Sequence, residues 1–189
     1  AKCCSVPWGP RFTSCRLLAD PADYESEVAG YVDLIKRNAS QTPCTLLHLG
    51  CGAGGHDGFF KQHFAVTGVD ISRGMLNKAR LRHPDVEYIE GDMRTVRLGR
   101  EFDAVAIPDS IDYMGSLPEL RMAIETAAAH LKSGGVLLVV GKTSEAFMDN
   151  NFAYSGGRED LHVTLLENNY INQYRPETYE ATLVYLIRR

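Results

Sequence analysis

The feature that most constrains the fold of this chain is a glycine-rich turn between two short apolar runs. The first run ends in Gly50, Gly52 and Gly54. The second run, Val66–Val69, is closed by Asp70. Glycines let a backbone turn sharply and approach a ligand at places where a Cβ would collide with it. The pattern therefore predicts a strand, a glycine turn, a helix and a second strand that hold a nucleoside, with the Asp70 carboxylate accepting both hydroxyls of its ribose.

The spacing of these glycines leaves two other interpretations open. Dehydrogenases bind NAD with a Gly-x-Gly-x-x-Gly turn, whereas here the glycines occur at every second residue and Gly55 adds a further one. A nucleotide-dependent oxidoreductase is therefore one alternative. A turn of purely structural glycines, as any α/β protein can contain, is the other.

The chain continues as an alternation of strand-like and helix-like segments. Further strands are expected at Val86–Asp92, Phe102–Ile107 and Val136–Val140, the last after a Gly-Gly turn. Helices are expected from Pro21, over Gly55–His63, from Ser72 to Pro84 and from Ser116 to Leu131. Such an alternation predicts an α/β fold, in which a parallel sheet carries helices on both faces.

After Val140 the pattern changes. Leu161–Glu167 and Tyr179–Arg188 alternate polar and apolar residues with a period of two, which predicts an antiparallel strand pair. The expected organisation is an irregular segment over 1–19, a ligand-binding core over 20–150, and extra strands over 151–189 that cover a substrate or form a dimer contact.

Composition and charge exclude several classes of function. The chain has 189 residues and a formal net charge of −4, so it lacks the basic footprint of a nucleic-acid-binding protein. Its longest apolar run, Val136–Val140, is far too short to span a bilayer, and no signal peptide is visible. Its five cysteines lack zinc-ligand spacing and predict neither a metal site nor a disulfide framework. We therefore expect a cytoplasmic protein with neither nucleic-acid nor membrane partners.

Three more sequence motifs follow the glycine turn: Gly-Asp-Met-Arg at 91–94, Phe-Asp-Ala-Val at 102–105 and Ser-Ile-Asp-Tyr-Met at 110–114. With the turn, they resemble the class I S-adenosylmethionine-dependent methyltransferases, and within them the small-molecule enzymes that include amino-sugar N,N-dimethyltransferases. The resemblance covers about residues 23–189 and implies a Rossmann-like, doubly wound sheet. It also implies direct displacement of a methyl group from S-adenosyl-L-methionine to a small-molecule nitrogen, or to an oxygen, leaving S-adenosyl-L-homocysteine.

The resemblance assigns the cofactor site residue by residue. Gly50, Gly52 and Gly54 would contact the methionine part of the cofactor through backbone groups. Asp70 would hold the two ribose hydroxyls, because a charged acceptor makes stronger hydrogen bonds than a neutral one. For Asp70, the alternative is a solvated aspartate in a turn.

The adenine would be held by the next two strand ends. Met75 would cover one face of the ring, Asp92 would accept from the adenine amino group, and the Met93 backbone would read the ring edge. Ile71 and Ile107 complete the predicted cofactor contacts. A core position for Met75 and a turn cap for Asp92 are the alternatives.

The predicted catalytic residues are Asp109, Asp112 and Tyr113, because in similar enzymes the acceptor approaches after the fourth strand. A carboxylate can orient a substrate ammonium, a tyrosine can hydrogen-bond the acceptor, and an amine must lose a proton before it attacks. The alternative is a polar loop that leads to the helix cap at Ser116. His56 would line the cofactor pocket or merely cap its helix.

The chain departs from the family pattern at His48, where an acidic residue usually lies close to the cofactor's amino group. A neutral imidazole accepts one hydrogen bond, a protonated one repels an ammonium, and a histidine packed under the turn is the third interpretation.

In the family pattern a further helix and a strand pair follow, and this sequence does not show them before Arg189. A catalytically silent cofactor-binding module is the resulting alternative. His162 and Tyr154 are weaker site candidates, and a homodimer through the extra strands is a further expectation.

Overall fold

The computed structural model describes residues 21–143, 147, 150–158, 160–175 and 178–188. These residues fall into two compact units, one over 24–146 and one that includes 147–189, and each is described by itself. The predicted irregular segment over 1–19 lies outside the described residues.

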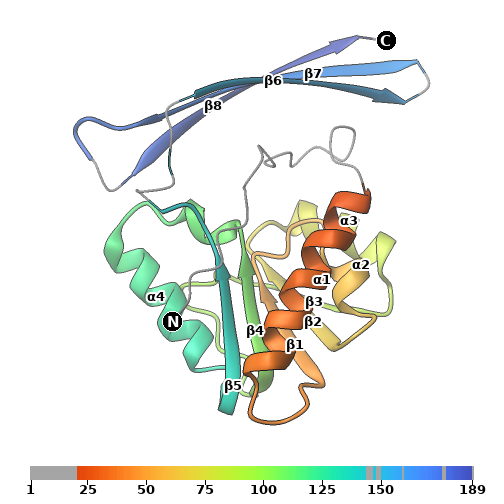
Figure 1. Cartoon of the computed structure of the whole chain (residues 1–189), viewed down its shortest axis with the longest axis vertical. Helices are drawn as coiled ribbons and strands as arrows, with labels where there is room; N and C mark the ends of the chain where they lie inside the picture. Colours follow the sequence, from red (N-terminus) through yellow and green to blue (C-terminus); the bar gives the residue numbers. More distant parts are fainter. Residues whose placement is uncertain (1–20, 144–146, 148–149, 159, 176–177, 189) are drawn as a thin grey trace. The chain divides into compact units, whose positions relative to one another are not determined.

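The first unit is built around a parallel sheet of five strands (Figure 1). They are β1 (Thr45–Leu49), β2 (Ala65–Asp70), β3 (Glu87–Glu90), β4 (Phe102–Pro108) and β5 (Leu131–Val140). Their order in the sheet is β3-β2-β1-β4-β5. The chain therefore moves outward from β1 in one direction and then returns to continue from β4 in the other. The switch point between β1 and β4 is where open parallel sheets bind ligands.

The helices of this unit are α1 (Pro21–Asn38), α2 (Asp57–Phe60), α3 (Arg73–Arg82) and α4 (Leu117–Ala128), with a 3-10 turn η1 (Ser110–Tyr113) after β4. Both predicted serine caps are confirmed, because the side chains of Ser72 and Ser116 accept hydrogen bonds from the backbone three residues later. None of the helices in the described part of the chain is both long and apolar enough to cross a membrane.

The sheet buries both of its faces, as the doubly wound prediction requires. Val28, Val32 and Ile35 of α1 pack with Leu46 of β1 on one face, which α2 and α3 also cover. The helix α4 lies on the other face (Figure 1). Its alanines pack against the alternate residues of β1 and β4. Alternate residues of one strand thus serve opposite cores, because successive Cβ atoms point to opposite faces.

Several predicted boundaries differ from the structure. The helix expected from Ser116 to Leu131 ends at Ala128, and Leu131 belongs to β5. The helix expected over Gly55–His63 is a regular α-helix only over Asp57–Phe60, since Gln62 and His63 donate to the carbonyls three residues back rather than four. The fifth strand begins earlier than predicted, at Leu131. It passes through the Gly-Gly turn as an irregularity, where the pairing with β4 shifts register.

The second unit contains an antiparallel sheet in the order β6-β7-β8. Its strands are β6 (Asn150–Arg158), β7 (Leu161–Ile171) and β8 (Tyr179–Arg188). The predicted strand pair is confirmed, whereas β6 was not expected, because Asn-Asn and Gly-Gly pairs interrupt its alternation. It forms a strand because it pairs with β7 along its whole length. The domain boundaries and the homodimer stay predictions.

Candidate functional site

The glycine turn after β1 depends on backbone conformations that suit glycine. Gly50, Gly52 and Gly54 have φ angles of 75°, 55° and 75°, in the left-handed region. At Gly50 a Cβ would lie 2.2 Å from the Oγ of Ser110, at the start of η1. The backbone of the turn therefore approaches the end of β4 closely, at the switch point of the sheet.

Asp70 ties this turn to the next helix. Its Oδ2 accepts from the backbone N–H of Gly52 and its Oδ1 from that of Ser72, each at 2.8 Å. Each carboxylate oxygen offers two acceptor positions. One position on each oxygen therefore remains for a ligand at the tip of β2.

The two predicted methionines flank the turn. The methyl group of Met75 in α3 lies 3.6 Å from an ideal Cβ at Gly52, and that of Met93 lies 2.9 Å from one at Gly50. Both side chains are half-buried. Ile71, the third predicted apolar contact, is 67% exposed just after β2. The structure thus brings both methionine side chains, the glycines and Asp70 to the same end of the sheet.

Asp92 follows β3 and is engaged by its own neighbour. Its two oxygens accept four hydrogen bonds from the backbone and guanidinium of Arg94. The Arg94 hydrogen bonds lower the pKa of the Asp92 carboxyl from its usual range. Arg94 also pairs with Glu119 at the start of α4. The turn-cap alternative for Asp92 thus has structural support, and its predicted contact with an adenine stays a prediction.

Ile107 lies in β4 and is fully buried. Its side chain packs in the core beside Leu49 and the alanines of α4. Its side chain therefore belongs to the core of this sheet face, and its predicted cofactor contact stays a prediction.

His48 is 1% exposed and pairs with a buried carboxylate. Its Nδ1 lies 2.5 Å from Oδ1 of Asp57, and the Tyr88 hydroxyl donates to Oδ2 of the same carboxylate at 2.9 Å. Burial by itself would raise the pKa of Asp57, but His48 and Tyr88 outweigh burial and lower it. Of the three interpretations of His48, the structure matches a histidine packed under the turn.

The three predicted catalytic residues occupy different environments around η1. Asp109 occupies the N-cap position of η1 without a capping hydrogen bond from its side chain, and its φ of 59° is positive. Asp112 accepts from the backbone N–H of Lys142, after β5, at 3.0 Å. Tyr113 is 82% exposed. His162 and Tyr154, the weaker candidates, belong to β7 and β6 of the other unit.

Asp109 belongs to a cluster that the sequence did not predict. Ligand-type atoms of Glu27, His56 and Asp109 all lie within 4.8 Å of one another. Nε2 of His56 is 3.3 Å from Oε2 of Glu27, whose Oε1 accepts from the Tyr31 hydroxyl at 2.7 Å. The ring of Tyr24 packs edge-on against His56, with centroids 5.0 Å apart. Glu27 was missed, although an acidic residue within the apolar stripe of α1 was a possible signal for it.

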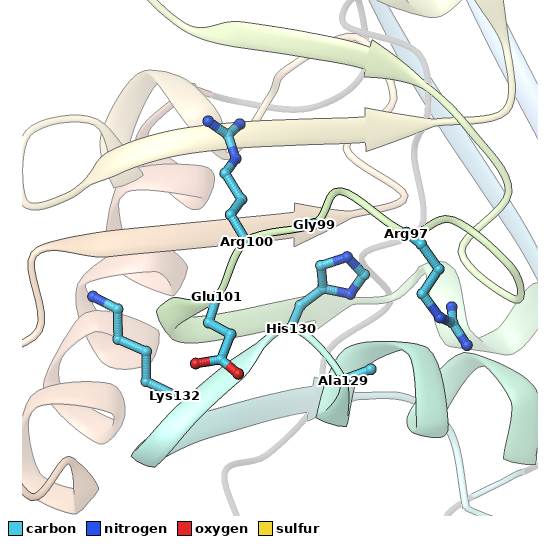
Figure 2. A pocket seen from close by; sticks show the side chains of 7 residues that line it. All are labelled: Arg97, Gly99, Arg100, Glu101, Ala129, His130 and Lys132. Carbon is cyan, nitrogen blue, oxygen red and sulfur yellow. The ribbon is translucent and has the colours of Figure 1, made fainter.

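A recess of about 580 Å³ opens at the other end of the sheet, away from the glycine turn. It is lined by Arg97, Gly99, Arg100, Glu101, Ala129, His130 and Lys132 (Figure 2). Its cations are engaged: Arg97 with Thr126, Arg100 with Glu87, and Lys132 with Asp103. His130 contacts Thr126 O through Nδ1 and accepts from Leu98 N–H through Nε2. Because these groups have partners and the recess lies near the amino ends of β4 and β5, it is not the candidate site.

Comparison with known sequences gives consistent matches. Residues 46–135 match the family described as a methyltransferase domain. The chain is 40% identical over 121 residues to dTDP-3-amino-3,4,6-trideoxy-alpha-D-glucopyranose N,N-dimethyltransferase of Streptomyces venezuelae, covering 62% of this chain and 50% of the relative. It is 38% identical over 119 residues to dTDP-3-amino-3,6-dideoxy-alpha-D-glucopyranose N,N-dimethyltransferase of Streptomyces fradiae, covering 62% and 46%. The chain thus spans about half the length of these curated relatives.

Solved structures agree. Streptomyces venezuelae DesVI superposes with a TM-score of 0.76 at 28% identity, over 88% of this chain and 77% of that chain. CalS10, an amino pentose methyltransferase from Micromonospora echinaspora solved with S-adenosylmethionine, gives 0.74 at 27% identity, over 87% and 76%. The predicted doubly wound fold and the predicted resemblance to amino-sugar methyltransferases are confirmed.

Proposed function

We propose that this chain is the cofactor-binding part of an S-adenosylmethionine-dependent methyltransferase that methylates an amino group of a nucleotide-linked sugar. The observation that carries the proposal is the left-handed glycine turn anchored to Asp70 at the switch point of the sheet. The match to a methyltransferase domain and to sugar N,N-dimethyltransferases supports the choice of cofactor and of acceptor class.

Asp70 would position the ribose of the cofactor. One acceptor position on each of its oxygens is used by the backbone N–H groups of Gly52 and Ser72. The second position on each oxygen would accept the 2′- and 3′-hydroxyls. Because the first pair of bonds holds the carboxylate in place, little conformational entropy would be lost on binding.

The half-buried methionines would enclose the base. Met75 lies beside Gly52 and Met93 beside Gly50, and an unbranched thioether adapts to a flat aromatic ligand. Three N–H groups of Arg94 make four contacts with the Asp92 carboxylate, so an adenine amino group would bind at the one acceptor position that they leave.

The proposed chemistry asks mainly for positioning. When bound, S-adenosylmethionine supplies an electrophilic methyl group on a sulfonium. The chain's part is to hold the acceptor nitrogen in line, which contributes through orientation and effective concentration. The segment from Asp109 to Tyr113 lies at the end of β4, beside the glycine turn, and is the side from which we expect the acceptor to approach.

Titration calorimetry with S-adenosylhomocysteine and with NADH tests the cofactor. We expect binding of the former alone, and binding of NADH alone would instead favour the oxidoreductase. Turnover is tested with S-adenosylmethionine and dTDP-3-amino-3,6-dideoxy-α-D-glucopyranose, with mass spectrometry of the sugar product. Tight cofactor binding without methylation of any amino sugar would favour the silent binding module.

A further inference from the structure

The Asp109 carboxylate is unusual among the charged groups at this end of the sheet. It is half-buried, and its oxygens accept no hydrogen bond within the described residues. Its backbone has a φ of 59°, a positive value that L-residues other than glycine seldom adopt. Burial and the neighbouring Glu27 raise the pKa of Asp109 to about 6. Strained backbone and unsatisfied charge of this kind cluster at functional sites.

The surroundings of Asp109 carry net negative charge. It faces Glu27 of α1, His56 of the glycine turn, Asp112 of η1 and Lys142 after β5. Within the described part of the chain, three carboxylates and one lysine meet here, and Asp112 accepts from the backbone N–H of Lys142. Two carboxylates brought close together repel each other unless a proton or a cation lies between them. The cluster is therefore expected to attract a positively charged ligand.

The aromatic neighbours narrow down the kind of cation. The Tyr24 ring packs on His56, and the Tyr31 hydroxyl donates to Glu27. Burial raises the pKa of Tyr24, and the charges of Glu27 and Asp109 raise it further, so this phenol lies in the field of both carboxylates. Tyrosine rings beside carboxylates suit organic ammonium groups, because the ring face attracts a cation while the carbon atoms next to the charge pack on it.

We propose that Glu27, His56 and Asp109, flanked by Tyr24, form a binding site for an alkylammonium group. The acceptor atoms lie within 4.8 Å of one another. Two acceptors that each lie ~2.8 Å from a tetrahedral nitrogen are about 4.6 Å apart. One ammonium nitrogen can therefore donate to both carboxylates at once, while the Nε2–H of His56 donates to Glu27.

Two ammonium groups are candidates for this site, and both assignments rest on the methyl transfer proposed above. One is the α-ammonium of S-adenosylmethionine, whose methionine end is expected at the glycine turn that carries His56. The other is the amino group of the acceptor sugar, which is expected to approach along Asp109. The chemistry of recognition is the same for both, so the ligands used in the test must tell them apart.

The test compares ligand pairs that differ only in the amino group. The first pair is S-adenosylhomocysteine and its analogue without the α-amino group. The second, measured with saturating S-adenosylhomocysteine, is dTDP-3-amino-3,6-dideoxy-α-D-glucopyranose and the corresponding 3-hydroxy sugar. We expect the wild type to prefer the amino ligand of one pair by about ten- to a hundredfold, as for a charge-assisted hydrogen bond. The pair that shows the preference identifies the ammonium.

Three variants give the comparison: Asp109→Asn, Glu27→Gln and, as control, Glu25→Gln, which removes an exposed charge from the same helix. The first two should reduce the preference to less than about threefold, and the control should keep it. Full preference in both site variants, with S-adenosylhomocysteine still binding, overturns the ammonium site alone. No binding of S-adenosylhomocysteine to the wild type overturns the proposed function together with the site.

Two more measurements complete the test. Circular dichroism shows whether the site variants fold. If one does not, the pH dependence of the wild type decides. Its preference for the amino ligand should fall as the pH is lowered through about 6, where Asp109 takes up a proton. A preference that is constant from about pH 8 to pH 5 overturns the proposal. Binding of Zn²⁺ that both site variants lose, with no change in amino preference, assigns the cluster to a metal instead.

Discussion

The buried contact between His48 and Asp57 leads to the sharpest prediction on stability. Both side chains are at most 1% exposed, and Asp57 also accepts from the Tyr88 hydroxyl. Asp57→Asn keeps the size of the side chain but removes the negative charge to which both His48 and the Tyr88 hydroxyl are hydrogen-bonded. Because loss of one partner leaves the others buried without compensation, we expect the free energy of unfolding to fall by about 3–5 kcal/mol.

The magnitude should be visible in two ways. A loss of this size corresponds to a drop in Tm of about 6–20 °C for a protein of this length. It is also a large part of the roughly 5–15 kcal/mol that stabilises a typical domain. Tyr88→Phe, which removes one neutral donor and leaves the carboxylate paired with His48, should cost only about 1–2 kcal/mol. Asp85→Asn, at an exposed carboxylate paired with Lys61, is the matched control and should change little.

Urea denaturation at pH 7 and at lower pH is the assay. The pKa of Asp57 is lowered in the folded protein, so its contribution is fully present above the unfolded pKa and is lost as the pH falls through the folded pKa. The difference between wild type and Asp57→Asn should therefore shrink below about pH 4. A variant within about 1 kcal/mol of the wild type at pH 7, with an unchanged m-value, would refute the role given to this pair.

Three other predictions concern the turn and the site. Gly50→Ala should destabilise the fold by at least about 2 kcal/mol, because the new Cβ meets Ser110 at a positive φ. Gly30→Ala in α1, which has open space around it, should stabilise the fold by about 0.5–1 kcal/mol. Thermal melts compare the two variants. Asp70→Asn should weaken S-adenosylhomocysteine binding at least about tenfold in calorimetry, and unchanged affinity would remove Asp70 from the site. The pKa of Asp109 is raised to about 6, so its contribution to stability is greatest below the unfolded pKa of about 3.9 and is lost as the pH rises towards 6. Asp109→Asn should abolish this loss in unfolding curves recorded across that range.

Much of the first unit could be predicted because its signals are local. A strand is indicated by a run of apolar residues, a cap by a serine before a helical pattern, and a left-handed turn by glycines. These signals placed β1, β2, β4, α3 and α4 within a few residues and put Asp70 at the tip of its strand. The strand β6 lacked such a signal, because its pairing with β7 and not its own pattern makes it a strand.

The amino-acid sequence alone therefore determined the parallel sheet, the glycine turn at its switch point and the position of the Asp70 carboxylate at the tip of β2. Only the tertiary structure decided what surrounds that turn. It showed that Asp57 pairs with His48 and accepts from the Tyr88 hydroxyl, that Glu119 pairs with Arg94 beside Asp92, and that Glu27 lies beside Asp109. The physical reason is that conformational preferences act between neighbours along the chain, whereas the ionisation and hydrogen bonding of a side chain depend on groups that only folding brings within reach.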